Sequence, residues 1–393
     1  MYNIIPYEYK NEQPWVISIS ERIKKITEAE RLGLKVVVYL YETPDTSTFR
    51  YRVYNMVQAL ELSLEWRGTY FYSNELDVVK EWLKDIDVVV ICRFRWNSKL
   101  QELIKKIKKM QIPLAFDSDD LVYDEKNIPL VMNTLSVEEN DERLNYWFSY
   151  IGRLSRVAKQ CDCLITTNDY LAEMMKADLG KDVYIAQNFL NRLQLEVSED
   201  YFEQRGNSYE DKFVVGYFSG TPSHINDFRV VGPEIKRALE ECEKMVLRVV
   251  GFMEMPSYMN DLIAQGKVER VGLVNFVDLQ KEIASVDLNI VPLVDNKFTN
   301  CKSELKFFEA AVVGTPTCAT PTFLFSNNIV NGIDGYLCKQ GEWYGIIKTL
   351  YDNRGAGYSD LMHAARKKCI NKYAYYNQTS NLDDIFNSIS GGR

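Results

Sequence analysis

The chain has 393 residues, which is more than one ordinary domain needs and suits two domains of about 200 residues each. A hydrophobic fraction of 46% and a charged fraction of 26% are ordinary for a globular protein and exclude intrinsic disorder, collagen and coiled coil. The net charge of −8 argues against a dedicated nucleic-acid-binding protein, and two histidines are too few for a histidine-rich metal site.

The sequence carries no visible membrane or secretion signal. No apolar run approaches the roughly 20 residues of a membrane span. Residues 1–13 are polar and lack the apolar centre of a signal peptide. The eight cysteines are scattered without a Cys-x-x-Cys pair, which favours buried free thiols over disulfides or zinc. We therefore expect a cytoplasmic protein.

Short β-branched runs alternate with helical patterns along the chain. The expected strands are 35–41, 87–91, 113–116, 163–166 and 183–186 in the first half, and 213–218, 246–250, 267–271, 288–292 and 317–319 in the second. Apolar runs of this length, spaced by helices, are typical of buried strands in parallel sheets. We predict an α/β protein with two doubly wound, Rossmann-like domains that face each other across a cleft at the carboxyl ends of their strands.

The boundary between the two domains is expected in residues 191–211, which are polar, acidic and poorly patterned. We assign residues 1–195 to the first domain and residues 210–373 to the second. The helical pattern from 357 to 390 is longer than the second domain needs. We therefore expect residues 374–393 to return to the first domain as a helix.

The most informative segment is 300–321, with the sequence NCKSELKFFEAAVVGTPTCATP. The pattern predicts a loop, then a helix that begins at Ser303 and stops at a glycine. Backbone N–H groups at a helix start can bind a phosphate, and Lys302 and Lys306 add positive charge. Glu309, one turn further along, can accept hydrogen bonds from two vicinal hydroxyls, as on a ribose. A surface helix with a capping serine and solvated charges explains the same residues.

This segment resembles the donor-site signature of retaining family-four glycosyltransferases, which have the two-Rossmann GT-B fold. It is most similar to the subgroup that builds bacterial surface glycans of the rhamnan type. Three further stretches, 215–228, 247–251 and 286–302, agree in order and spacing with the donor domain of that family. In the first half the resemblance is weaker and rests on 48–60 and 115–123.

The resemblance assigns the ribose to Glu309. It implies that Lys302 and Lys306 hold the donor phosphates and take the catalytic part, with Ser303 and Leu305 also at the donor. Two positions depart from the family pattern: Cys301 stands where a glutamate usually contacts the donor sugar, and the usual Arg and Lys pair after the first donor-domain strand is missing. That loop instead carries Ser219, Gly220, Thr221 and His224, whose first three residues offer backbone amides to the phosphates.

An acidic run, Asp117-Ser118-Asp119-Asp120, follows one first-half strand. A D-x-D sequence there could bind Mn²⁺ through oxygen ligands. Helix capping and loop solvation explain the same residues. In the resembled family this strand end lies near the acceptor and the donor sugar, which implies that Asp119 takes a catalytic place or that Asp120 anchors an acceptor hydroxyl.

Four arginines follow first-half strands and are expected at the mouth of the cleft. Arg50 and Arg52 could contact donor phosphate or an anionic acceptor, and Arg93 and Arg95 are candidates for the acceptor side; solvated arginines fit equally well. The basic helix over 99–110 is either a solvated face or a surface that touches anionic membrane from the cytoplasmic side.

The resemblance implies a retaining, metal-independent glycosyltransferase without a cofactor. It would move a sugar from a dTDP-, UDP- or GDP-sugar, held by the second domain, to a hydroxyl of a glycan or lipid-linked saccharide on the first. The departing diphosphate would accept the acceptor proton, so charge stabilisation by the two lysines is the main protein contribution. A non-catalytic GT-B subunit that assists an active partner, and a sugar-nucleotide epimerase, are the alternatives.

Overall fold

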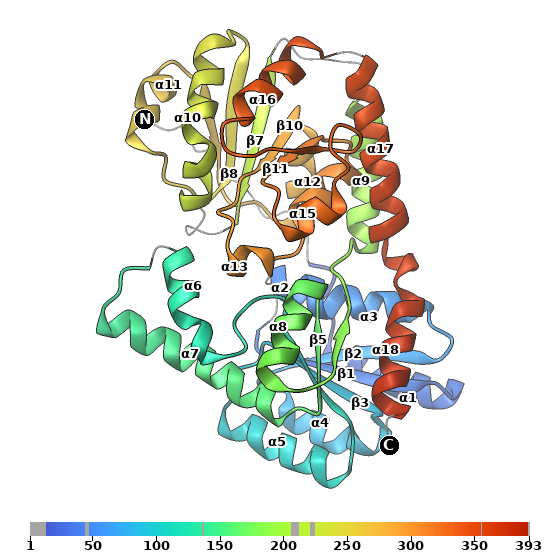
Figure 1. Ribbon diagram of the computed structural model, residues 1–393. Helices are drawn as coiled ribbons and strands as arrows, with labels where there is room; N and C mark the ends of the chain where they lie inside the picture. Colours follow the sequence, from blue (N-terminus) through green and yellow to red (C-terminus); the bar gives the residue numbers. More distant parts are fainter. Residues whose placement is uncertain are drawn as a thin grey trace.

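The computed structural model describes residues 13–43, 47–135, 137–205, 212–220, 225–354 and 356–391. Two six-stranded sheets form two domains, one above the other in Figure 1. Every pairing within the two sheets is parallel. This arrangement confirms the predicted α/β class with two Rossmann-like domains.

The first sheet has the order β2-β1-β3-β4-β5-β6. Strand β1 shows why the apolar runs become strands here. Val37 and Tyr39 pack into one apolar cluster, and Val36 and Val38 pack into another on the opposite face. Both faces of the strand are covered, so an unbroken apolar run is the pattern that fits. The strands in sheet order are β2 (Trp66–Tyr72), β1 (Lys35–Tyr41), β3 (Val88–Cys92), β4 (Leu114–Asp117), β5 (Cys163–Thr166) and β6 (Val183–Ile185).

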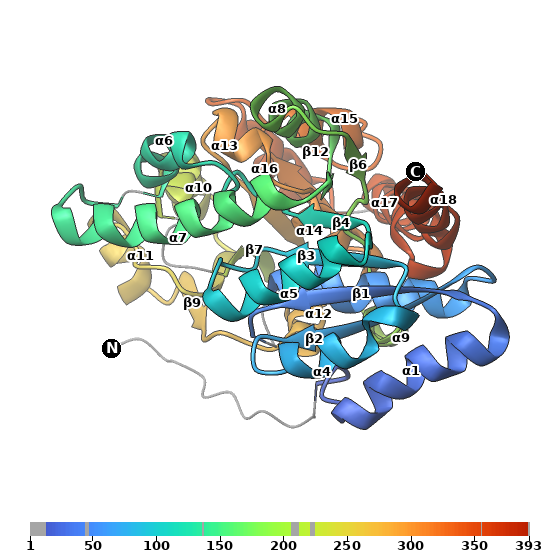
Figure 2. The ribbon, with the colours of Figure 1, turned by 90° about the horizontal axis from the view of Figure 1, so that it is seen from below.

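The helices of the first domain cover both faces of this sheet. In chain order they are α1 (Ile19–Leu32), α2 (Ser47–Phe49), the π-helical turn η1 (Arg50–Tyr54), α3 (Asn55–Ala59), η2 (Leu60–Leu62), α4 (Leu76–Trp82), η3 (Leu83–Asp85), α5 (Ser98–Lys109), η4 (Glu125–Asn127), α6 (Ile128–Thr134), α7 (Asp141–Gln160) and α8 (Asp169–Leu179). Helices α6 and α7 lie on one side of the molecule, away from the C-terminal helices α17 and α18, in both views (Figures 1 and 2).

The second sheet has the order β12-β11-β10-β7-β8-β9. Its strands in sheet order are β12 (Tyr336–Leu337), β11 (Thr317–Ala319), β10 (Leu288–Val291), β7 (Phe213–Ser219), β8 (Met245–Gly251) and β9 (Val268–Val271). The helices of this half are α9 (Arg192–Arg205), α10 (Ile225–Glu241), η6 (Ser257–Met259), α11 (Asn260–Ala264), α12 (Phe276–Ala284), α13 (Lys297–Asn300), α14 (Leu305–Val312), α15 (Phe323–Asn328), α16 (Trp343–Asp352), α17 (Ala356–Tyr373), η7 (Tyr375–Asn377) and α18 (Thr379–Gly391).

Two strands of the structure, β2 and β12, were not predicted from the sequence. Strand β2 is aromatic rather than β-branched and contains Gly68, yet it pairs with β1 over its whole length. A Cβ on Gly68 would stand 3.1 Å from the Cα of Val57 on α3, so the missing side chain allows the helix to approach the sheet closely. Strand β12 has only two residues, too few to form a recognisable pattern.

The expected linker, residues 191–211, is helical over most of its length. Helix α9 buries Gln194 and Ser198 completely, and Ser198 Oγ accepts a hydrogen bond of 2.9 Å from Gln280 of α12. The segment looked like a linker because its buried contacts are partly polar. Residues 206–211 lie outside the described part.

The C-terminal helical pattern is divided into two helices. Helix α17 packs on α14 of the second domain, whereas α18 packs on the first sheet. On α18, Phe386 is fully buried, and its ring lies 5.4 Å from that of Trp66 and 6.3 Å from that of Tyr39. The break falls at the 3₁₀ turn η7, beside the bridge between Leu190 and Ala374 where the chain crosses back.

All eight cysteines are buried and unpaired, as predicted. Among the described helices, none combines the length and the apolar character that a bilayer crossing requires.

Candidate functional site

Each sheet has one switch point, where the strand order reverses, and the two switch points carry most of the predicted site residues. In the first sheet it lies between β1 and β3, and in the second between β7 and β10. Ligands of open α/β sheets bind at the carboxyl ends of the strands at such points. The segments that leave these four strand ends are 42–54, 93–97, 219–220 and 292–304.

The prediction that the signature helix begins at Ser303 is wrong. The chain first forms the short helix α13, and α14 begins only at Leu305. Its N-cap residue is Glu304, whose side chain makes no capping hydrogen bond. Ser303 is not a cap because its hydroxyl accepts a hydrogen bond of 2.9 Å from Asn188 of the first half. The helix ends before Gly314, as predicted, where φ is +70° and a Cβ would stand 2.6 Å from the ring of Phe202.

Helix α13 docks onto the first domain. Phe298 and Cys301 are buried within the apolar cluster of that domain. The sulfur of Cys301 lies 3.6 Å from that of Met174, and its carbonyl accepts a hydrogen bond of 3.0 Å from Asn168. The position where the resembled family has a donor-binding glutamate is therefore occupied by a domain contact. Glu304 does not replace that glutamate, because it accepts a hydrogen bond of 2.8 Å from Tyr373.

Lys306 is a cation held between α14 and β7. Its Nζ lies 5.7 Å from the centre of the Tyr217 ring, and it forms no ion pair with a described residue. Burial lowers the pKa of Lys306 to about 8, with Lys302 acting in the same direction and Asp227 in the opposite one. Lys302 is likewise partly exposed, with its Nζ 4.7 Å from the ring centre of Phe298. The two lysines thus place positive charge beside the start of α14.

Glu309 is buried on α14 and faces the first domain. Its Oε1 accepts a short hydrogen bond from Tyr51 and lies 3.9 Å from Nη2 of Arg50. Burial raises the pKa of Glu309, while Arg50 and the Tyr51 hydroxyl act to lower it. Arg50 itself is mostly buried between the rings of Tyr51 and Phe276. Tyr51 is a site residue that sequence reasoning missed, although it lies within the stretch 48–60 that carries the weaker resemblance.

The carboxyl end of β7 is shaped by a close approach of β8. Gly251 has a φ of +97°, and a Cβ there would stand 1.9 Å from the carbonyl oxygen of Ser219. The Ser219 hydroxyl donates a hydrogen bond of 2.6 Å to the Phe252 carbonyl, so the expected contribution of this residue to phosphate binding is limited to its backbone. Gly220 is exposed with open space around it. Thr221 and His224 lie outside the described residues.

Arg52 does not reach the mouth of the cleft, contrary to expectation. It is completely buried and pairs with Asp117 through two hydrogen bonds of 2.7 and 2.9 Å. It also donates to Asn188, the residue that binds Ser303. Because the η1 turn points inward at Arg52, the ion pair of Arg52 with Asp117 is structural. Through Asn188 it links strand β4 to Ser303 in the loop before α14.

Asp119 and Arg93 form a partly buried pair at the end of β4. Arg93 Nη1 lies 2.9 Å from Asp119 Oδ1, and Thr48 donates to the other oxygen at 3.4 Å. Although burial acts to raise it, the charges of Arg93 and Arg52 hold the pKa of Asp119 below its usual value. The φ of Arg93 is +40°, a strained conformation that places its side chain on Asp119 and on the Tyr150 hydroxyl at 3.2 Å.

The remaining candidates have local partners. Asp120 accepts a hydrogen bond of 2.9 Å from the Leu121 amide, which is the loop-capping alternative. Arg95 is partly exposed and pairs with Glu42 at 2.8 Å. Since Asp117 is taken by Arg52, the D-x-D reading loses one of its ligands. Within the described ranges, no group of three or more His, Cys, Asp or Glu side chains is placed to hold a metal ion.

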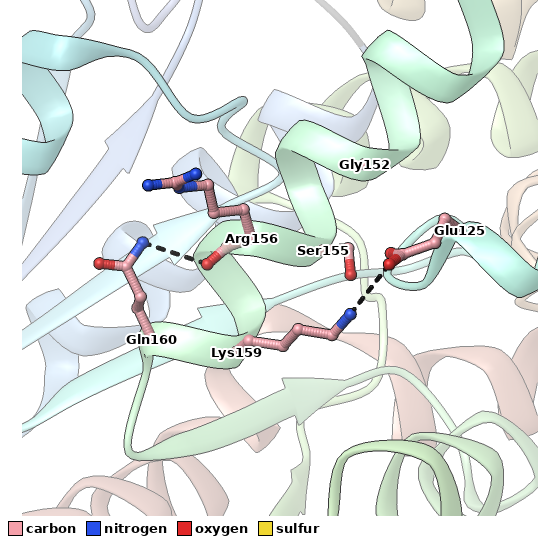
Figure 3. A pocket seen from close by; sticks show the side chains of 6 residues that line it. All are labelled: Glu125, Gly152, Ser155, Arg156, Lys159 and Gln160. Atoms are coloured by element: carbon pink, nitrogen blue, oxygen red, sulfur yellow. Dashed lines mark hydrogen bonds and ion pairs between the residues drawn. The ribbon is translucent and has the colours of Figure 1, made fainter.

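A hollow of about 510 Å³ lies apart from this site, on the flank of α7 (Figure 3). Lys159 and Glu125 form an ion pair of 3.1 Å at its edge. It is lined by Glu125, Gly152, Ser155, Arg156, Lys159 and Gln160. None of these belongs to either switch point, so the hollow is separate from the predicted chemistry.

Comparison with known proteins agrees with the second half of the chain. Residues 213–353 match the family model described as "Glycosyl transferases group 1". This range contains the second sheet and α14 with Lys306 and Glu309. The family match covers the second domain, and the two Rossmann-like domains together have the arrangement of the GT-B fold.

Several solved structures share the whole fold at low identity. HepE from Anabaena, crystallised with UDP and glucose, matches at 14% identity over 90% of this chain and 100% of its own, with a TM-score of 0.56. A glycosyltransferase from Rickettsia africae matches at 11% identity over 91% and 98%, with a TM-score of 0.61. Sucrose-phosphate synthase from Thermosynechococcus elongatus matches at 12% identity over 91% and 100%, with a TM-score of 0.59. No curated protein matches the sequence.

Proposed function

We propose that this protein transfers a sugar from a nucleoside diphosphate donor to a hydroxyl of a glycan or lipid-linked saccharide, with retention at the anomeric carbon and without a metal. The observation that carries the proposal is Lys306, a partly buried cation without a described ion-pair partner, one helical turn from Glu309 within the family-matched domain. A charge that is partly withdrawn from water without a partner is unfavourable, so its presence here supports an anionic ligand.

The donor would bind to the second domain, residues 210–373. The diphosphate would lie on Lys302, Lys306 and the N–H groups at the start of α14, and the ribose on Glu309. As the bond to the sugar breaks, negative charge develops on the departing diphosphate, and fixed positive charge there lowers the barrier. A UDP-sugar is the first donor to test, because HepE was crystallised with UDP and with UDP-glucose.

The acceptor would bind to the first domain, residues 1–195 with the returning segment 374–393. Asp119 follows β4 and is held by Arg93 beside the switch point of the first sheet, where it could accept a hydrogen bond from an acceptor hydroxyl. Arg95 and Asp120 follow the neighbouring parallel strands β3 and β4, at the same edge of the first sheet. The low pKa of Asp119 suits a carboxylate that orients a hydroxyl rather than one that removes its proton.

The place of action that we propose is the cytoplasm, in the synthesis of cell-surface polysaccharide. The exposed lysines of α5 offer a surface for peripheral contact with the inner face of the membrane. They are Lys99, Lys105, Lys106, Lys108 and Lys109. Sedimentation of the protein with vesicles that contain anionic lipid, but not with neutral vesicles, would support that contact.

The experiment that tests the function is a thermal-shift screen with UDP, GDP and dTDP, followed by assays of donor hydrolysis with the matching sugar nucleotide. We expect one nucleotide to raise the melting temperature. Lys306→Ala should abolish that shift and lower turnover by about a hundredfold or more. Lys348→Ala, which removes an exposed lysine of α16, is the matched control and should change neither. Near-normal turnover in Lys306→Ala would refute the assignment.

A non-catalytic GT-B subunit is the second candidate, and one observation favours it. The docking of Cys301 onto Met174 leaves no carboxylate at the usual donor-sugar position. If no nucleoside diphosphate shifts the melting temperature, this second candidate is preferred.

A further inference from the structure

The turn η1 carries first-domain side chains to the boundary with the second domain. Its π-helical winding follows directly on α2, which lies at the edge of the first domain that faces the second (Figure 1). The extra residue in a π turn changes the direction of successive side chains, and such turns are frequent at functional sites. Here Arg52 points into its own domain toward Asp117, while Arg50 and Tyr51 point at Glu309 of α14.

The neighbours of the Tyr51 hydroxyl determine which of its hydrogen bonds it donates and which it accepts. Gln194 Nε2 donates to the Tyr51 oxygen at 3.1 Å. The amide of Gln194 is itself fixed, because its Oε1 accepts a hydrogen bond of 3.2 Å from the backbone N–H of Asn191. The Tyr51 oxygen therefore accepts from Gln194 and donates to Glu309. All three side chains are buried, so water does not compete for these hydrogen bonds.

The contacts of the Glu309 carboxylate are one-sided. Within the described part of the chain, both Tyr51 and Arg50 approach Oε1. A carboxylate with one oxygen engaged is held in one rotamer, and its second oxygen can still accept from a ligand hydroxyl. Burial raises the pKa of Glu309, and Arg50 opposes this effect by favouring the ionised form, which can accept hydrogen bonds and cannot donate one.

We propose that Tyr51 is a positioning residue for nucleotide binding: it holds Glu309 so that the carboxylate can accept hydrogen bonds from the ribose hydroxyls of the donor. This inference rests on the proposed function. It adds a residue of the first domain to a site that otherwise belongs to the second. Ribose recognition then depends on the contact between the domains, since Tyr51 reaches Glu309 only when the two domains meet.

The test compares UDP with 2′,3′-dideoxy-UDP, which lacks both ribose hydroxyls, or the same pair on the base that the thermal-shift screen selects. Dissociation constants are measured by calorimetry for the full chain. We expect the unaltered protein to prefer UDP. In Tyr51→Phe, UDP affinity should fall about five- to tenfold while dideoxy-UDP affinity stays the same, so that the preference is lost. A general loss of structure would instead weaken both ligands equally.

Two further variants keep the result decisive. Tyr54→Phe removes a hydroxyl from the same turn whose described partner is Gln58, and it should leave the preference intact. In a Glu309→Gln background, Tyr51→Phe should have no further effect on the preference, because Tyr51 acts through Glu309.

The outcomes separate the two proposals. A preference that survives Tyr51→Phe, an equal loss for both ligands, or an additive effect in Glu309→Gln overturns the role of Tyr51 and leaves the proposed function standing. If the unaltered protein binds UDP and dideoxy-UDP equally, the ribose role of Glu309 and the positioning role of Tyr51 both fail. If it binds no nucleotide, the proposed function fails as well.

Discussion

At the scale of the residue, Lys306 combines two properties that rarely coexist in one lysine. It is partly buried, which favours its neutral form, and its nearest opposite charges only partly compensate. An ordinary lysine stays charged through the whole physiological range, whereas this one titrates near its upper end. The side chain therefore gains most from an anionic ligand that supplies the missing negative charge.

The lowered pKa predicts a pH dependence of nucleotide affinity. As the pH rises through about 8, Lys306 of the free protein loses its proton, and binding of a diphosphate must then recover one. UDP affinity measured by calorimetry should therefore fall between pH 7 and pH 9. In Lys306→Arg the side chain stays protonated over this range, so most of the fall in UDP affinity with pH should disappear. Lys348→Arg is the control, and an unchanged slope in Lys306→Arg would contradict the prediction.

Two arginines that are neighbours in the sequence take different places in the fold. Arg50 and Arg52 are two positions apart in one motif, and the same role was expected of both. Arg50 lies at Glu309, while Arg52 is completely buried on Asp117. The difference arises because residues two positions apart in a helical turn point to different sides, and only the packing of the turn decides which side faces which domain.

At the scale of the element, α13 is a docking helix rather than part of a loop. The helix has four residues, and the side chain of Phe298 fixes its position. This side chain is 2% exposed and lies within the apolar cluster of the first domain. Asn296, its N-cap, also donates a hydrogen bond of 3.1 Å to Thr134 of α6. The signature segment is thus attached to the opposite domain immediately before α14 begins.

Removal of the Phe298 ring should weaken this attachment. Phe298→Ala leaves a cavity in a packed cluster, and we expect a loss of about 3 to 5 kcal/mol in the free energy of unfolding, measured by chemical denaturation. The domain contact should also open more often, which limited proteolysis can detect. Phe323→Ala removes the same ring from a site that is 38% exposed and should cost less than about 1 kcal/mol. Equal losses in the two variants would show that α13 does not hold the domains together.

At the scale of the whole molecule, the chain crosses between the domains twice. Residues 186–191 lead into α9 and the second domain, and the turn η7 leads back to α18 on the first. The two crossings are adjacent, since Leu190 and Ala374 form a bridge and Gln187 binds Gln378 at 3.1 Å. Any movement of one domain against the other would therefore bend both segments at one place.

The return of α18 predicts that the C-terminus stabilises the first domain. Phe386→Ala removes a ring that packs on Trp66 and Tyr39, so the expected loss is about 3 to 5 kcal/mol. Unfolding followed by tryptophan fluorescence should show the loss. Tyr376→Ala, at a position that is 47% exposed in the turn before α18, is the control. A variant as stable as the control would mean that α18 packs only loosely on the first sheet.

The sequence by itself determined the features that depend on local order. Apolar runs of strand length predicted two parallel sheets because strands buried on both faces need them, and the spacing of Lys302, Lys306 and Glu309 placed a phosphate-and-ribose pattern on one helix. Aromatic β2 and polar α9 were missed because their residues suit other states as well, and contacts made later in folding decide between them.

Only the tertiary structure decided which of these side chains meet. Cys301 lies on Met174, Arg52 on Asp117 and Tyr51 on Glu309, and each pair is separated by at least 65 residues. The type of a residue determines what its side chain can bind. The path of the backbone between two residues determines whether they meet. The physical reason is that burial removes water as the default partner, so the final contacts are fixed by which groups are enclosed together.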